Sequence, residues 1–173
     1  MINAGNRAGA VEALQRIAGM PQLESRMYLQ AWHFLREAGM QPPAEKANEL
    51  MGVVVEVGMP KGLDLVAGYA DHCARYYNFS GAGVVWERPN DTLNEPIDDL
   101  LRTGSTVLQS IGPWKGERPA APRSGEARIN LLTPSGLHFG QGPMQALAKD
   151  PLAGPLINSA FRLMQALIQQ TKK

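Results

Sequence analysis

The spacing of hydrophobic positions changes along the chain and divides it into helical and extended segments. Over residues 6–50, apolar side chains recur every three or four positions, as they do on one face of an α-helix. At Met51 the period falls to two, and the segment 51–88 consists of short β-branched and aromatic runs bounded by turn residues. Four strands joined by tight turns in so short a segment predict an antiparallel meander.

Helical spacing returns over 92–112 and is followed by a Pro-rich loop, 113–126, that has no periodicity. The segment 127–139 then predicts a hairpin, and 143–170 is again helical. This order predicts one α+β domain, residues 1–173, with an antiparallel sheet of five to six strands and with N-terminal helices and a C-terminal helix packed on it. Apolar side chains on both faces of the meander predict helices on two sides of the sheet.

Turn and capping residues predict where individual helices begin and end. Gly39 stands where a helix over roughly 22–38 needs a residue with positive φ after its last turn. Asn94 is the expected N-cap of the central helix, because that choice leaves Pro96 in the first turn, where a missing N–H costs nothing.

Composition narrows the class of protein. The chain of 173 residues is 44% hydrophobic and 19% charged, which is typical of a folded globular domain. With 17 basic and 16 acidic residues its net charge is +1, so no basic field is present to attract nucleic acid. We see no apolar run of membrane-spanning or signal-peptide type, and the single cysteine cannot form an internal disulfide, so we expect a soluble, cytoplasmic protein without a membrane partner.

The triplet Asp71-His72-Cys73 is the most chemically suggestive stretch, because it places an acid, an imidazole and the only thiol side by side. A nucleophilic thiol needs a base directed at it, and a metal site needs three or four ligands, but His33 and His138 lie in distant segments. A hairpin tip explains the triplet better. We therefore predict no catalytic residue, no metal site and no cofactor.

The hairpin hypothesis also predicts which side chains share a face of the sheet. With two-residue turns at Asp71-His72 and Ser80-Gly81, Arg75 lies opposite both Gly68 and Trp86. One face then carries Val66, Gly68, Cys73, Arg75, Tyr77, Val84 and Trp86. An Arg75–Trp86 cation–π contact on that face would suit a partner-binding surface. We favour the simpler interpretation, in which a helix covers this face and Arg75 extends past it.

The segment 133–143 concentrates glycine and proline around Ser135 and His138. It lacks the Gly-x-Ser-x-Gly elbow of serine hydrolases and the glycine-rich phosphate loop. Its glycines could present backbone N–H groups to an anion, but a tight hairpin followed by a helix start explains the same residues without a ligand, and we favour that interpretation. The candidate residues for binding a ligand or partner are Arg75, Tyr77, Trp86, Trp114 and His138.

The N-terminal helices suggest an oligomer. On the helix over 22–38, Tyr28, Trp32 and Leu35 form a second apolar stripe beside the main one, and a second stripe favours a second partner. We therefore expect a homodimer that buries one of these helices or a sheet edge, with Tyr28 and Trp32 at the interface.

Two functional hypotheses follow. The first is a non-enzymatic binding or protein-interaction module. The alternative is a small-ligand sensor or an enzyme, with a pocket between the sheet and the 113–126 loop. At least two of His72, Cys73, Ser135 and His138 would have to converge in an enzyme.

Overall fold

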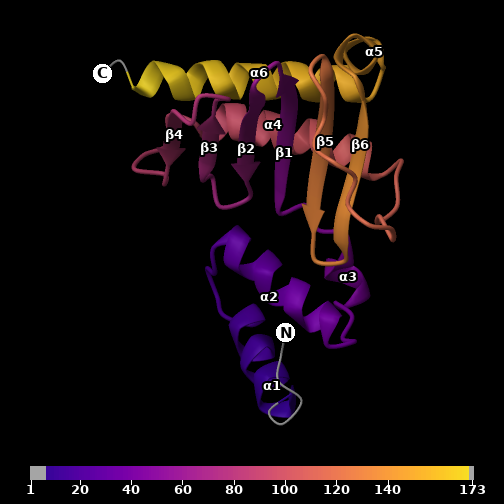
Figure 1. Cartoon of the computed structure of the whole chain (residues 1–173). Coiled ribbons are helices and arrows are strands. Elements are labelled where there is room, and N and C mark those ends of the chain that lie inside the picture. The colour runs from indigo at the N-terminus through magenta and orange to yellow at the C-terminus, as the bar shows by residue number, and fades with distance from the viewer. Residues whose placement is uncertain (1–6, 172–173) are drawn as a thin grey trace.

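The computed structural model describes residues 7–171, whose strands form one six-stranded antiparallel sheet (Figure 1). The strands are β1 (Gly52–Met59), β2 (Gly62–Tyr69), β3 (Ala74–Tyr77), β4 (Gly83–Trp86), β5 (Glu126–Thr133) and β6 (Gly136–Pro143). The helices are α1 (Arg7–Ala18), α2 (Ser25–Glu37), α3 (Ala44–Ala47), α4 (Asn94–Leu108), α5 (Met144–Lys149) and α6 (Ala153–Gln170). The strand order is β4-β3-β2-β1-β5-β6. The predicted α+β fold class is confirmed.

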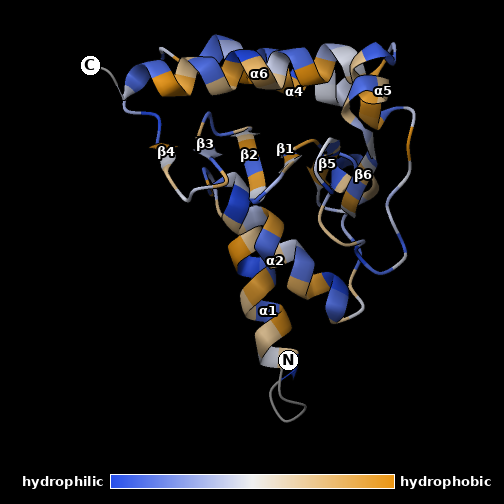
Figure 2. Ribbon diagram, turned by 45° about the horizontal axis from the view of Figure 1, so that its top comes forward, coloured by the Kyte–Doolittle hydropathy of each residue, from blue (hydrophilic) through white to orange (hydrophobic). Residues whose placement is uncertain are grey.

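The hydrophobic core lies between one face of the sheet and the pair α4 and α6 (Figure 2). Alternate residues of the strands, among them Val53 and Leu131, are fully buried there. The two helices approach the sheet closely at Gly68, where a Cβ atom would lie 3.2 Å from the Cδ2 atoms of both Leu100 and Leu163. Because Gly68 has no side chain, two leucines, one from each helix, can pack against the strand at this point.

The N-terminal helices lie on the opposite side of the sheet from α4 and α6 (Figure 2). Helix α2 is attached at its start by a reciprocal pair of hydrogen bonds: the Ser25 N–H donates to the Asp71 carboxylate (2.8 Å), and the Asp71 N–H donates to Ser25 Oγ (3.1 Å). At its other end, the Arg36 guanidinium donates to the Pro134 carbonyl oxygen. Helix α1 packs on α2, so part of the wide apolar surface of α2 is covered within the chain.

The predicted helix end at Gly39 is confirmed. Gly39 has a φ of +85°, and the N–H of Met40 donates to the Leu35 carbonyl oxygen at 2.9 Å, as in a Schellman motif. The predicted N-cap is wrong by one position, because Asn94 is already the first residue of α4 and Leu93 precedes it. The Asn94 side chain donates to Asp91 (2.8 Å) instead of capping the helix.

The predicted register of the β2–β3 hairpin is wrong by one residue. The N–H of Tyr69 donates to the Cys73 carbonyl oxygen (3.0 Å), so the turn has three residues, 70–72, and Ala67 is opposite Arg75. The Asp71 carboxylate accepts the Cys73 N–H (3.1 Å) while it also caps α2, and both bonds favour this longer turn. A shift of one residue moves every side chain of a strand to the other face.

The β3–β4 hairpin differs from the prediction in the same way. The Asn78 side-chain oxygen accepts the N–H groups of Ser80 and Ala82, which closes a longer turn and places Arg75 opposite Val85. Arg75 and Trp86 therefore lie on opposite faces, and their predicted cation–π contact is wrong. The Arg75 guanidinium donates instead to the Trp86 carbonyl oxygen at 3.0 Å.

The approach of two helices at Gly68 makes a stability prediction. We expect Gly68→Val to lower the free energy of unfolding by about 1–3 kcal/mol, because the added methyl groups collide with Leu100 and Leu163. The matched control is Gly140→Val in β6, where no atom lies within 4 Å of an added Cβ and valine favours the strand. Urea denaturation measures both variants. Equal stabilities of the two would contradict the packing described.

Candidate binding site

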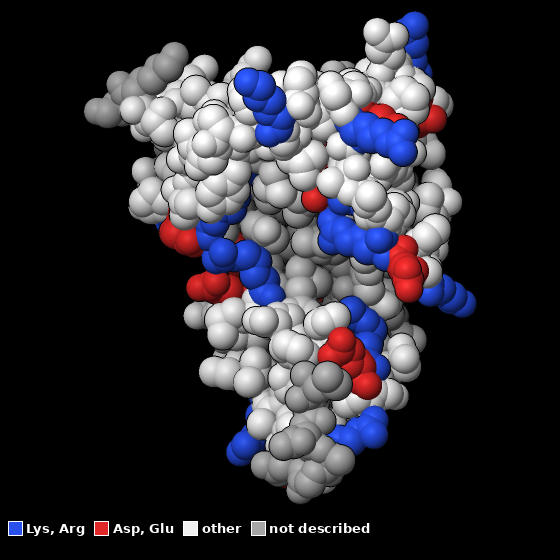
Figure 3. Space-filling model, viewed as in Figure 1, with Lys and Arg blue, Asp and Glu red and all other residues white. Residues whose placement is uncertain are grey.

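The face of the sheet turned away from α4 and α6, here called the open face, carries charged and polar side chains beside apolar ones. One row across it consists of Val85, Arg75, Ala67, Val54, Asn130 and Phe139, and the next row contains Tyr77, Leu65, Glu56, Arg128 and Gln141. Figure 3 views this face and shows it hollowed between the sheet and the N-terminal helices, with basic side chains on both flanks. The hollow is the principal site to consider.

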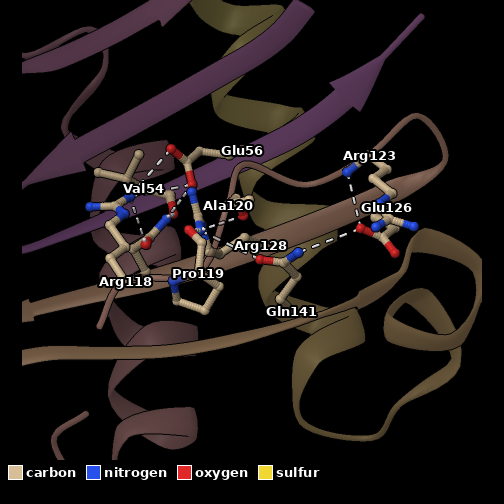
Figure 4. A network of polar contacts seen from close by, with 10 residues as sticks. Val54, Glu56, Arg118, Pro119, Ala120, Arg123, Glu126, Arg128 and Gln141 are labelled. Carbon is tan, nitrogen blue, oxygen red and sulfur yellow. Dashed lines mark hydrogen bonds and ion pairs between the residues drawn. The ribbon is translucent and has the colours of Figure 1, made fainter. Parts of the chain in front are cut away.

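A buried ion pair lies in the middle of the open face (Figure 4). The Glu56 carboxylate accepts from Arg128 Nε at 2.5 Å and from Asn130 Nδ2 at 3.2 Å. All three residues are less than a tenth exposed. Burial by itself raises the pKa of Glu56, but the hydrogen bonds from Arg128 and Asn130 and the nearby positive charges outweigh it, so the pKa is lowered below its ordinary value. Glu56 is therefore an ion-paired carboxylate at neutral pH.

The 113–126 loop crosses the open face and is fixed at both ends. Near its start the Trp114 N–H donates to the Leu137 carbonyl oxygen (2.8 Å), and near its end the Gly125 N–H donates to the Gly58 carbonyl oxygen (3.2 Å). A Cβ on Gly58 would lie 1.9 Å from the Arg123 carbonyl oxygen, so glycine is required for this close approach. In between, Arg128 donates to the carbonyl oxygens of residues 119 and 120.

Arg118 is the loop side chain that enters the charged cluster. Its guanidinium lies 3.4 Å from one Glu56 oxygen, 3.5 Å from the other and 3.3 Å from the Asn130 side-chain oxygen. These contacts are long, because Arg128 already occupies the better position on the carboxylate. The Arg118 side chain remains half-exposed.

A pocket of about 190 Å³ opens where α2, the loop and the β5–β6 hairpin meet. It is lined by Leu29, Arg36, Arg118, Leu132, Thr133, Gly136 and Leu137. Burial lowers the pKa of the Arg36 guanidinium, partly offset by the charge of Glu37. Glu37 itself pairs with His33 (3.5 Å), and among the described residues no carboxylate forms an ion pair with Arg36.

A second cavity of about 220 Å³ lies on the helix side, between the sheet and α6. Its lining is mostly apolar and includes Val55, Val57 and Met164. The polar groups at its rim satisfy each other, since the Tyr76 hydroxyl donates to the Asp64 carboxylate at 3.3 Å.

The structure separates the five predicted binding residues. Arg75 and Tyr77 lie on the open face. Trp114 packs against Phe139 beside it, with the two rings tilted and their centroids 4.9 Å apart. Trp86 and His138 are buried on the helix side, because their strand partners Ala74 and Leu131 belong to the core there. The shared binding face expected for Arg75 and Trp86 is therefore wrong.

The triplet 71–73 is a hairpin tip, and its His72 side chain points away from those of Asp71 and Cys73, toward α4. Asp71 caps α2, and the ring of His72, a residue with φ of +61°, bonds to Asp98 of α4 at 2.9 Å. Cys73 lies 3.4 Å from the Glu87 carboxylate. Burial, the charge of Asp71 and the contact with Glu87 raise the pKa of the Cys73 thiol to about 12, which keeps it protonated.

The other predicted reactive groups are also apart. Ser135 Oγ bonds to Thr133 and Asn48, and the His138 ring is buried with its Nδ1 unpartnered within the described chain. Residues 7–171 contain no group of three His, Cys, Asp or Glu side chains placed to hold a metal ion. Within the same residues, no helix has both the length and the hydropathy needed to cross a membrane.

Sequence reasoning missed the residues that form the charged cluster and the pocket. A usable signal was present. Glu56 interrupts a run of valines, and Arg128 and Asn130 are two positions apart in a predicted strand, which places them on the same side of it. Charges inside strands of a core sheet need partners on the neighbouring strand. No comparable signal marks Arg36, because its position depends on how α2 docks.

Comparison with known proteins adds no information about the site. No family model matches the chain, and no solved structure matches it.

The Glu56–Arg128 pair predicts a pH-dependent effect of mutation. We expect Glu56→Gln to cost on the order of 3 kcal/mol at pH 7, because it leaves Arg128 buried without its counter-charge. The pKa of Glu56 is lowered in the folded chain, so the stabilisation is present above the unfolded carboxyl pKa of about 4.3 and disappears as the pH falls through the folded pKa.

The difference in unfolding free energy between the wild type and Glu56→Gln should accordingly shrink with acid, as measured by urea denaturation from pH 7 to pH 3. Glu45→Gln on the exposed α3 is the control and should change little. A penalty for Glu56→Gln that stays constant with pH would contradict the ion pair.

Proposed function

We propose that the chain is a non-enzymatic binding module and that its ligand or partner occupies the pocket between α2, the 113–126 loop and the β5–β6 hairpin. The observation that carries the proposal is the incomplete cover of the open face. Helices α4 and α6 enclose one side of the sheet, while the other side is hollowed and has arginine side chains at its pocket. Concave sites that combine apolar walls with a few polar groups are typical of ligand binding.

Binding is favoured over catalysis because the groups suited to catalysis are separated. His72 is bonded to α4, the Cys73 thiol is held protonated, and His138 is buried on the opposite face from the pocket. Of the four residues predicted to converge in an enzyme, only Ser135 adjoins the β5–β6 turn, where its partners are Thr133 and Asn48. A nucleophile needs an activating base. The carboxylate beside the Cys73 thiol, Glu87, instead raises the pKa of the thiol and so disfavours the reactive thiolate.

The pocket beside α2 is favoured over the cavity under α6 because its lining includes two arginines with few protein partners. Within residues 7–171, Arg36 has one carbonyl partner and Arg118 has only long contacts, whereas Tyr76 and Asp64 at the other cavity bond to each other. A guanidinium has five N–H donors, so both arginines retain donors for a ligand.

A fragment screen by NMR tests which surface binds. In ¹H–¹⁵N spectra of the full chain recorded against a general fragment library, we expect the recurrent shift changes at the amides of Leu29, Leu132 and Leu137. The amides of Val57 and Met164 report on the cavity under α6 in the same spectra and should stay unchanged. Recurrent hits at the α6 cavity alone, or hits at neither cavity, would overturn the proposal.

We also propose that the chain forms a twofold homodimer, and the exposed fractions of the candidate residues favour a sheet-edge contact over the face of α2 that carries Tyr28 and Trp32. Tyr28 and Trp32 are half-buried, whereas Tyr77, Phe79 and Val85 on the β3–β4 hairpin are 42%, 48% and 53% exposed. Strand β4 is an edge of the sheet, and edge strands readily pair.

Light scattering at micromolar concentration should give twice the 18.8 kDa chain mass. We expect Val85→Lys to lower that mass toward one chain and Trp32→Glu to leave it unchanged. The reverse result would assign the contact to α2, and a monomeric wild type would refute the dimer.

A further inference from the structure

We infer that the pocket beside α2 binds a small carboxylate with a short apolar chain, held by Arg36 and Arg118. This inference rests on the proposed binding function and adds the chemical class of the ligand.

The charge balance of the cluster calls for an anion. Arg36 and Arg118 line the pocket, and Arg128 shares the Glu56 carboxylate with Arg118. Among the described residues, Glu56 is the one acidic side chain that forms an ion pair with any of the three arginines. Even with the nearby charge of Glu37 counted, the three arginines leave a net positive charge at a half-buried site. An anionic ligand would bring the cluster closer to neutrality without disturbing the Glu56–Arg128 pair.

The two arginines that line the pocket are also the two with donors to spare. Arg36 is half-buried and donates to the Pro134 carbonyl oxygen. Arg118 touches Glu56 only at 3.4–3.5 Å, so a ligand can compete for it. Planar guanidinium groups bind carboxylates with paired, charge-assisted hydrogen bonds.

The other residues that line the pocket favour a ligand with an apolar chain. Leu29, Leu132 and Leu137 form the walls, and the volume of about 190 Å³ has room for only a short chain. A carboxylate lying between the arginines would direct such a chain toward the leucines. A free fatty-acid-like ligand and the C-terminal residue of a peptide share this chemistry.

The experiment titrates the full chain with hexanoate, followed by amide shifts of Leu29, Leu132 and Leu137. Hexan-1-ol and hexan-1-amine are probes of the same length without the negative charge. We expect hexanoate to bind at least tenfold more tightly than either, and we expect added salt to weaken its binding. Arg118→Gln and Arg36→Gln should each weaken hexanoate on the order of tenfold, which is the effect of losing one charge-assisted hydrogen bond.

Arg102→Gln on α4 is the matched control, because Arg102 is exposed and faces away from the pocket. Arg36 bonds to the β5–β6 hairpin, so Arg118→Gln decides the result if Arg36→Gln fails to fold. An acetylated peptide that ends in leucine tests whether the ligand is the C-terminus of a peptide or a small carboxylic acid. The peptide is titrated with an unmodified C-terminal carboxylate and with an amidated C-terminus. If the peptide with the carboxylate binds more tightly than hexanoate, the site is assigned to a peptide C-terminus.

The outcomes separate this inference from the proposed function. Equal binding of hexanoate, hexan-1-ol and hexan-1-amine in the pocket would overturn the anion inference and leave the binding function standing. Shifts at the pocket that persist unchanged in Arg118→Gln would overturn it as well. If neither the fragments nor hexanoate change the amide shifts at the pocket, the anion inference and the proposed binding function are both overturned.

Discussion

A carboxylate in the middle of a central strand is the constraint from which the open face is built. Glu56 cannot be buried as an ion without a partner, and its place opposite Arg128 on β5 supplies one. Arg128 then has donors left over, which are taken up by backbone carbonyl groups of the 113–126 loop. One buried charge therefore sets the pairing of two strands and holds a long loop across them.

The position of the core explains why this face can carry charge. The apolar contacts that stabilise the sheet are concentrated between the strands and the pair α4 and α6, on the other side. Helix α2 instead meets the sheet through a few directed hydrogen bonds, at Asp71 and at Pro134, and through limited apolar contact. The face beside α2 is thus held in shape by polar contacts at its margins, which leaves its interior open to a ligand.

Sequence patterns predicted the elements of the fold but not their exact pairing. The change of period at Met51 located the meander, and Gly39 located the end of α2, because both signals are local. The register of the β2–β3 hairpin depends on two bonds of Asp71. The bond to the Cys73 N–H is local, but the bond to Ser25 joins residues 46 positions apart, and no local pattern encodes it. The pocket was missed for the same reason, since Arg36 reaches a residue 98 positions along the chain.

The way the 113–126 loop is attached has a consequence for how such a protein can diversify. Both ends are bonded to strands, at Leu137 and at Gly58, while residues 112–121 are exposed along their whole length. Insertions between Trp114 and Arg118 leave the bonds at both ends of the loop and the bonds to Arg128 in place, and alter only the part of the loop that lies over the sheet. The scaffold can therefore be kept constant while one wall is exchanged, as in folds that acquire new specificities by loop variation.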